Sequence, residues 1–361
     1  MVAVPSRNQL LILNQSARCL FEALSAGAAP EDLAAILVGR YGIDEGHAAR
    51  DVAATLAQWA SAGALEGGRR PAAVPPAPAP PDRPARFSEV YAFGGHPVRV
   101  EVDDPVLAAP LGRLLGPLQA PDHAAPVEVP AVRAVQVPDG SFAIRLGRGE
   151  IRRAPDHDLA LGEIINALID HFHPGVRWLA IIHASAVLAA GGAVVMAAPS
   201  GSGKSTLCAA LTQSGHRYMS DDVVPLAADG LAYPMPLAQS LKRGSWHVLA
   251  GRVPGLPDPD DRAPGRETEH YRAVDPAMIA GRPAEIAAFV VPRYAPGAAL
   301  QHRELDPFST FTHLIRARSW ASLQRDDLER LLGVIHKTSR FELVYGSLDE
   351  AIAFLGRLRA G

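Results

Sequence analysis

The sequence predicts an α/β core built around a phosphate-binding loop, with a β-rich subdomain and a small N-terminal α+β module. Three observations support this. The motif PSGSGKST at 199–206 follows an apolar run and precedes a helical pattern. Alternating runs around Gly-Gly and Pro-Asp-Gly between residues 87 and 150 indicate β-hairpins. A Pro- and Ala-rich stretch at 66–86 cannot bury a core and is therefore expected to be a linker.

The composition is typical of a globular protein in a reducing compartment. Of 361 residues, 48% are hydrophobic and 20% are charged, and the net charge is −3. This charge does not favour nucleic acid or an anionic membrane as a partner. The two cysteines, Cys19 and Cys208, are far apart and lack metal-ligand spacing. No long apolar run typical of a signal peptide begins the chain, so we expect a cytoplasmic protein.

The most apolar segment, 177–198, has nearly the length of a membrane span. It contains His183, a Gly-Gly turn signal and the approach to the phosphate-binding loop. These features predict buried strands instead of a membrane helix.

Residues 1–65 are expected to form a winged-helix-like module with one strand at 9–13 and three short helices. Pro30 suits the first turn of the second helix, and Gly42 ends it. Asp44 is placed to cap the third helix. Apolar residues at helical spacing predict the core: Leu20, Phe21, Leu24, Leu33, Ile36, Leu37, Val52, Leu56 and Trp59. Such a module is suited to binding rather than to catalysis.

The run LNQSARCLFEAL…APEDLAAILVGRYGID…DVAATLAQWASAGAL, within about residues 5–65, resembles the PqqD-like fold. Members of that family recognise leader peptides of ribosomally made natural products. The resemblance implies that a peptide adds as a strand beside Leu10–Leu13 and leans on the third helix. The family usually begins with a longer β-hairpin than this chain supplies.

The loop carries the residue types that hold a nucleoside triphosphate. Gly201 and Gly203 let backbone amides turn onto phosphate oxygens. Lys204 places a cation near the β and γ phosphates, and Ser205 offers a hydroxyl to Mg²⁺. Ala198 stands where the first glycine of the pattern usually lies. The other residues expected at the phosphates are Pro199, Ser200, Ser202 and Thr206, the last of which begins a helix whose positive end faces the anion.

A phosphate-binding loop indicates a nucleotide but no particular reaction. The chain contains neither the transporter signature LSGGQ nor the guanine-reading motif NKxD. It does carry Asp221 and Asp222 after the strand pattern 217–220. On adjacent strand positions the two carboxylates would point to opposite faces. One is therefore expected near Mg²⁺ and the other near a hydroxyl nucleophile.

The set HASAVL…PSGSGKST…GHRYMSDD, residues 183–222, resembles the catalytic half of bacterial HPr kinase/phosphorylase. The resemblance implies an α/β P-loop kinase core in which Lys204 holds phosphate. Asp222 would be the general base for a serine hydroxyl, and His183 would tune that base. Ser205 would bind Mg²⁺, and Asp221 would stay close to the metal.

Towards the C-terminus the resemblance is looser and points to a related branch found with peptide-modification systems. The glutamate-bearing motif of the parent family is missing, and LAQSLKRGSW at 237–246 lies at about that place. We therefore do not expect phosphorylase activity. Lys242 or Arg243 is a candidate phosphate contact, with a solvated charge pair as the alternative. Arg266 is a candidate arginine clamp, and 254–270 is expected to be a mobile active-site lid.

Together, these patterns predict a peptide-binding module at 1–65, a linker at 66–86, a β-rich subdomain at 87–155 and a catalytic domain at 156–361. We expect an ATP- and Mg²⁺-dependent Ser/Thr kinase acting on a precursor peptide captured by the first module. A regulator of a folded carrier protein and a nucleotide-gated peptide chaperone stay open as alternatives. The peptide, the acceptor residue and a homo-oligomeric state are not determined by the sequence.

Overall fold

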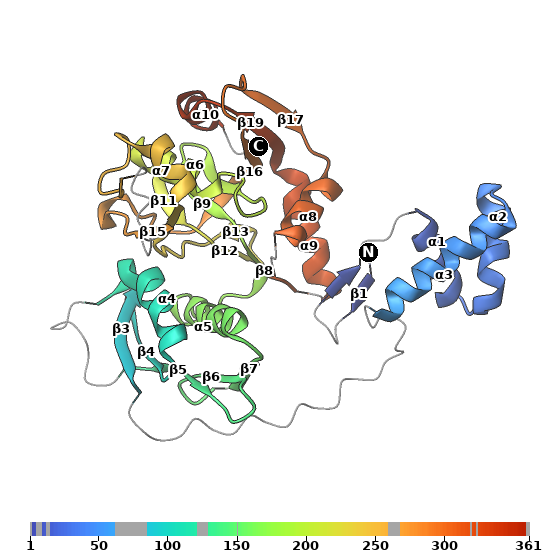
Figure 1. Ribbon diagram of the computed structural model, residues 1–361, viewed down its shortest axis with the longest axis horizontal. Coiled ribbons are helices and arrows are strands. Elements are labelled where there is room, and N and C mark those ends of the chain that lie inside the picture. Colours follow the sequence, from blue (N-terminus) through green and yellow to red (C-terminus); the bar gives the residue numbers. More distant parts are fainter. Residues whose placement is uncertain are drawn as a thin grey trace. The chain divides into compact units, whose positions relative to one another are not determined.

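Helices and strands alternate through two units of the chain, Met1–Pro76 and Ala77–Gly361, and give a mixed α/β protein (Figure 1). The computed structural model describes residues 2–4, 9–11, 15–61, 85–120, 129–149, 151–258, 268–317, 320–322 and 324–358. Residues 66–84 of the predicted linker at 66–86, and residues 62–65 before it, lie outside this described part.

The N-terminal unit consists of a short hairpin and three α-helices. Strand β1 (Val2–Val4) pairs antiparallel with β2 (Gln9–Leu11). The sequence predicted β2 but not β1, since three residues are too few for an alternating pattern. The helices are α1 (Gln15–Ser25), α2 (Leu33–Tyr41) and α3 (Glu45–Ser61).

The backbone geometry confirms the predicted helix ends. A 3₁₀ turn at Pro30–Asp32 leads into α2, because the fixed φ of proline suits a first turn. Gly42 ends α2 with a left-handed φ of 67°. The Asp44 carboxylate accepts a hydrogen bond of 2.9 Å from the His47 N–H at the start of α3.

Leucines from the first two helices form the centre of this unit. Leu20, Leu33 and Leu37 have no exposed surface, and burial of one such side chain contributes about 1.5–3 kcal/mol. The rings of Phe21 and Trp59 meet edge to face with their centroids 6.0 Å apart. The predicted core of this module is therefore confirmed at these positions.

The second unit begins with a five-stranded sheet. Its strands follow the order of the chain: β3 (Phe87–Phe93), β4 (His96–Val102), β5 (Ala131–Gln136), β6 (Phe142–Leu146) and β7 (Ile151–Ala154). Gly94 and Gly95, with φ of 59° and 86°, turn the first hairpin as predicted. Helix α4 (Pro105–Leu115) connects β4 to its parallel neighbour β5.

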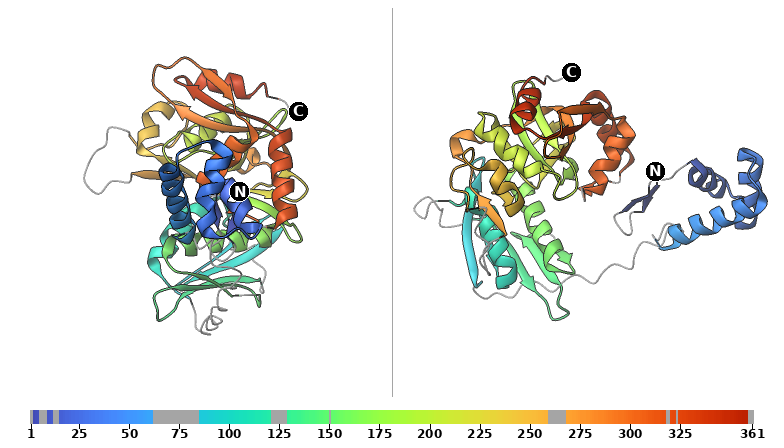
Figure 2. Two further views of the ribbon diagram at one scale, coloured as in Figure 1. Left: turned by 90° about the vertical axis from the view of Figure 1, so that its right-hand side faces the viewer. Right: turned by 45° about the horizontal axis from the view of Figure 1, so that its top comes forward.

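Helix α5 (His157–Phe172) packs with α4 on one side of this sheet (Figure 2). Its buried residues Ile164, Leu168 and Ile169 belong to the same apolar cluster as Val98 and Val100 of β4. The sequence groups this helix with 156–361, whereas its apolar face contributes to the core of the five-stranded sheet.

A ten-stranded sheet forms the rest of the unit. Its strands are β8 (Trp178–Ile182), β9 (Ser185–Ala189), β10 (Gly192–Met196), β11 (Arg217–Ser220), β12 (Val224–Ala227), β13 (Leu231–Ala232), β16 (Ala284–Tyr294), β17 (Gln301–Glu304), β18 (Trp320–Ala321) and β19 (Ser339–Tyr345). Strand β16 is parallel to both β10 and β19. The residues of 177–198 form β8, β9 and β10, as predicted. No helix in the described ranges is long and apolar enough to cross a membrane.

Helices and a two-stranded ribbon complete this unit. The helices are α6 (Lys204–Gln213), α7 (Arg243–Leu249), α8 (Pro307–Arg316), α9 (Arg325–Lys337) and α10 (Leu348–Leu355). The ribbon pairs β14 (Gln239–Lys242) antiparallel with β15 (Glu269–Arg272). Leu207 of α6, Trp246 of α7 and Leu355 of α10 share one buried cluster with the residues of β10. This core holds the segment between β10 and α6 in place.

Candidate functional site

The glycine-rich segment connects β10 to the start of α6. Gly201 and Gly203 have left-handed φ values of 85° and 101°, a conformation that residues with a Cβ rarely adopt. A Cβ on Gly203 would also lie 2.9 Å from the Tyr345 hydroxyl, whereas one on Gly201 would meet open space. Gly203 is therefore required both by its backbone and by the space around it.

Lys204 folds its side chain back over this segment. Its Nζ donates to the carbonyl oxygen of Ala198 at 2.6 Å and to that of Pro199 at 3.3 Å. Burial lowers the pKa of Lys204, and the negative charges of Asp221 and Asp222 oppose that change. The backbone of Ala198 does not have a positive φ, so alanine is accommodated at the position where the pattern usually has glycine.

Asp221 is fully buried and held by three donors. Its Oδ1 accepts from the hydroxyl of Ser185 and, at 3.1 Å, from that of Ser205, while its Oδ2 accepts from the backbone N–H of Ser240 at 3.1 Å. Burial, together with the charge of Asp222, raises the pKa of Asp221 to about 6, although the hydrogen bonds partly offset the change. The sequence indicated that this acid lies near the loop serine, and the structure places the two in contact.

Asp222 differs from its neighbour in both exposure and backbone conformation. Its side chain is 44% exposed, and its Oδ1 lies 3.9 Å from Nδ1 of His183. Among the described residues other than glycine, it is the one with a positive φ, 77°. Such a conformation costs about 1–3 kcal/mol and is found preferentially at functional sites.

The divergence of the two carboxylates has a different cause from the one predicted. The sequence was interpreted as a strand that includes both aspartates, with side chains on opposite faces. The strand β11 ends at Ser220, so the alternation of a pleated strand does not apply to them. The left-handed turn at Asp222 is what directs its carboxylate away from that of Asp221.

The ribbon of β14 and β15 faces the loop. Lys242 donates from Nζ to Oγ of Ser200 at 2.8 Å, and on the neighbouring strand it is paired with Glu269. The Glu269 carboxylate accepts hydrogen bonds from the Ser240 hydroxyl and, at 2.9 Å, from the Tyr271 hydroxyl. Ser240 therefore joins Glu269 to Asp221, with its hydroxyl bound to one and its N–H to the other.

Glu269 and Ser240 are site residues that the sequence did not reveal. Ser240 lies in the quoted run LAQSLKRGSW, and Glu269 lies far from it in the sequence. Only their pairing across the ribbon brings the two together, and no local motif marks such a pairing. The other phosphate-contact candidate, Arg243, begins helix α7 directly after the ribbon and places its guanidinium 5.5 Å from the ring centre of Trp246. Arg266 lies outside the described residues, so the clamp stays a prediction. Of the predicted lid at 254–270, residues 259–267 also lie outside them, whereas its last two residues belong to strand β15 and not to a loop.

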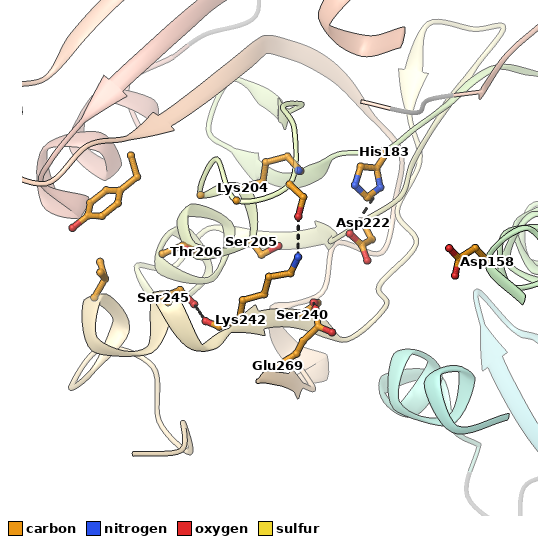
Figure 3. A pocket seen from close by; sticks show the side chains of 16 residues that line it. Asp158, His183, Lys204, Ser205, Thr206, Asp222, Ser240, Lys242, Ser245 and Glu269 are labelled. Carbon is orange, nitrogen blue, oxygen red and sulfur yellow. Dashed lines mark hydrogen bonds and ion pairs between the residues drawn. The ribbon is translucent and has the colours of Figure 1, made fainter. Parts of the chain in front are cut away.

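These elements enclose a cavity of about 670 Å³, shown in Figure 3. Its lining residues are Asp158, His183, Ser200, Gly201, Gly203, Lys204, Ser205, Thr206, Asp222, Ser240, Lys242, Gly244, Ser245, Val248, Glu269 and Tyr294. The predicted candidates Pro199, Ser202 and Asp221 do not line it. Asp221 instead lies behind the cavity wall, in contact with Ser205.

Comparison with known families gives a match within the first unit. Residues 1–65 match the family model described as coenzyme PQQ synthesis protein D (PqqD). No curated protein matches the chain. The match supports the resemblance seen in the N-terminal module. The resemblance of residues 183–222 to HPr kinase stays a prediction.

Proposed function

We propose that the chain is an ATP- and Mg²⁺-dependent kinase that phosphorylates a Ser or Thr hydroxyl on a peptide held by its N-terminal module. The main observation is the contrast between two adjacent acids beside the loop. Asp221 is buried against Ser205, while Asp222 is accessible in the cavity beside His183. These are the two environments that a metal site and a proton acceptor need.

The loop and the ribbon supply the cations for the phosphates. Lys204 and Lys242 both line the cavity, and backbone amides at Gly201 and Gly203 lie at the start of α6. An anion placed there would meet two ammonium groups and the positive end of a helix. The negative charge of bound phosphates would also attract the Lys204 ammonium away from the carbonyl oxygens of Ala198 and Pro199 that it now contacts.

Ser205 and Asp221 fit the requirements of Mg²⁺. Magnesium keeps several waters and is usually bound by one or two carboxylates together with phosphate oxygens. The described residues contain no group of three His, Cys, Asp or Glu side chains that could hold a metal by themselves. Bound Mg²⁺ would neutralise charge on the phosphates. The chain would contribute the Ser205 hydroxyl, with the buried Asp221 carboxylate behind it accepting the hydrogen bond of that hydroxyl.

Asp222 is our candidate for the general base. Its exposed carboxylate can accept the proton of a hydroxyl that enters the cavity. The nearby imidazole of His183 can stabilise the ionised carboxylate when it carries a proton. Because phosphoryl transfer requires little covalent chemistry from the protein, positioning by these groups would supply most of the catalysis.

The PqqD match supports a peptide as the substrate. A binding module on the same chain raises the local concentration of whatever it holds. The catalytic unit could then act on a peptide that it binds weakly by itself.

Intact mass spectrometry of precursor peptides encoded beside this gene tests the proposal, after incubation with the protein, ATP and Mg²⁺. We expect the gain of one phosphate. The Asp222→Asn variant should lose about 100-fold or more in rate while still binding ATP, and asparagine tolerates the left-handed backbone. Deleting residues 1–65 should also slow the reaction strongly.

Other outcomes would point to the alternatives. Bound ATP and bound peptide without any phosphate transfer would favour a nucleotide-gated chaperone. Phosphorylation of a folded carrier protein without a peptide requirement would favour the regulator. Equal turnover of the peptide after deletion of residues 1–65 would refute the role of the first module.

A further inference from the structure

One wall of the cavity comes from a different layer of the unit than the loop does. Asp158 lines the cavity and lies in the first turn of α5, the helix that packs on the five-stranded sheet. Figure 3 shows its carboxylate facing the cavity from that helix, on the same side as the labelled Asp222 and His183. The five-stranded sheet thus brings a charged group to the proposed acceptor end of the site.

The two lysines of the cavity lie together, and Glu269, the strand partner of Lys242, also lines the cavity. Lys204 lies on the loop and Lys242 contacts the loop through Ser200, so the cations gather where phosphates would bind. Asp158 and Asp222 lie towards the other end. Within the described ranges, Asp158 makes no hydrogen bond or ion pair. A ligand that enters beside Asp222 therefore meets an acid with no internal cation to neutralise it.

Exposed apolar side chains adjoin this acid. The described residues include five large apolar side chains that are well exposed, and two of them are Val106, 64% exposed, and Leu159, 54% exposed. His157 and Asp104 lie 3.5 Å apart and hold the starts of α4 and α5 side by side. We call Val106, Asp158 and Leu159 the α4–α5 rim. Asp158 is the residue of this rim that lines the cavity, whereas Val106 and Leu159 do not line it.

We propose that the α4–α5 rim recognises the acceptor segment of the substrate peptide through a cationic side chain close to the Ser or Thr that is phosphorylated. An apolar side chain of the same segment would cover Leu159 or Val106. This inference rests on the proposed kinase function and adds to it a substrate class: hydroxyl residues with a neighbouring Lys or Arg. The negative charge of Asp158 complements a cationic side chain, and Asp158 lines the cavity from a different helix than the loop lysine.

Binding of short labelled peptides tests the rim separately from catalysis. The probes are synthetic nine-residue peptides with one central Ser and with Lys, Gln or Glu two positions away. They are titrated by fluorescence anisotropy into the full-length Asp222→Asn protein with Mg²⁺ and a non-hydrolysable ATP analogue. We expect the Lys peptide to bind about threefold to tenfold more tightly than the Gln peptide, as for a partly exposed ion pair.

Two further substitutions and a matched control make the test specific. Asp158→Asn should abolish the preference for Lys, and Asp158→Lys should reverse it towards the Glu peptide. Asp158 also stabilises the start of a helix, so the control is Asp326→Asn, an exposed aspartate in the first turn of α9. This control should leave the preference unchanged.

Equal binding of the three peptides, or a preference for Lys that survives Asp158→Lys, would overturn the assignment of the rim. A preference for Lys that survives Asp158→Lys is also the result expected if the N-terminal module binds the probes instead of the rim. A preference that responds to Asp158, together with no phosphate transfer by the unsubstituted protein, would instead refute the kinase and leave the rim as a peptide-binding surface.

Discussion

Replacing Asp221 by Asn should make the nucleotide-free protein less sensitive to pH. The wild-type carboxyl has a pKa raised from 3.8 to about 6, because folding buries it next to Asp222. The folded state therefore binds a proton more tightly than the unfolded state. Stability from this group is complete below the unfolded pKa and is lost as the pH rises through the folded value.

The magnitude follows from the two pKa values. A shift from 3.8 to about 6, at about 1.4 kcal/mol per pKa unit, corresponds to about 3 kcal/mol above neutral pH. At about pH 5 roughly half of this has already been lost. Asparagine is uncharged throughout, so the stability of Asp221→Asn relative to wild type should rise by about 1.5 kcal/mol between about pH 5 and pH 8.

Thermal unfolding at several pH values, followed by tryptophan fluorescence, measures this difference. Trp246 is 2% exposed and belongs to the core that supports the loop. A relative change of about 1.5 kcal/mol corresponds to roughly 3–5 °C in Tm. The hydrogen bonds of the asparagine in Asp221→Asn do not change with pH in this range. The control variant, Asp326→Asn, shows how Tm changes with pH when an exposed carboxylate is removed instead. A difference in Tm that stays constant from about pH 5 to pH 8 would refute the raised pKa of Asp221.

Three further predictions concern the walls of the cavity. Gly203→Ala should destabilise the protein by about 1–3 kcal/mol in denaturant unfolding, because its Cβ would meet the Tyr345 hydroxyl at 2.9 Å. Gly201→Ala, where a Cβ would meet open space, should destabilise it by only about 1 kcal/mol. Equal losses of stability in the two variants would contradict this account. Lys242→Met should weaken ATP binding about tenfold in calorimetry through the loss of one phosphate contact, with little change in Tm; unchanged affinity would show that the lysine is only a solvated charge. Glu269→Gln should raise KM for ATP more than it lowers kcat, because Glu269 positions the ribbon without touching the reacting atoms. A fall in kcat with unchanged KM would argue against this role.

Local signals predicted the N-terminal module and the loop well. Pro30, Gly42 and Asp44 act within a single turn of helix, and each was found in its predicted role. Gly201 and Gly203 likewise need only their own backbone conformation to be recognised. Strand β1 was missed because pairing with a neighbour, rather than its three residues, defines it.

The candidate site was predicted in part. The sequence indicated His183 and the two aspartates, and the structure brings them to the loop. The pleated-strand argument for their divergence was wrong, since a single left-handed residue produces it. Glu269 was missed because its place depends on pairing between two strands, β14 and β15, that are far apart in the sequence.

The sequence by itself determined the three helices of the N-terminal unit, α5, α6 and the glycine-rich loop between β10 and α6, because glycine and proline conformations, capping and hydrophobic periodicity are properties of neighbouring residues. Only the tertiary structure decided which of two adjacent acids is buried, since burial depends on what packs around each carboxylate. It also decided that Asp158 of helix α5 and Glu269 of strand β15 line the same cavity. Those positions depend on contacts between residues far apart in the chain, which a short run of sequence does not reveal.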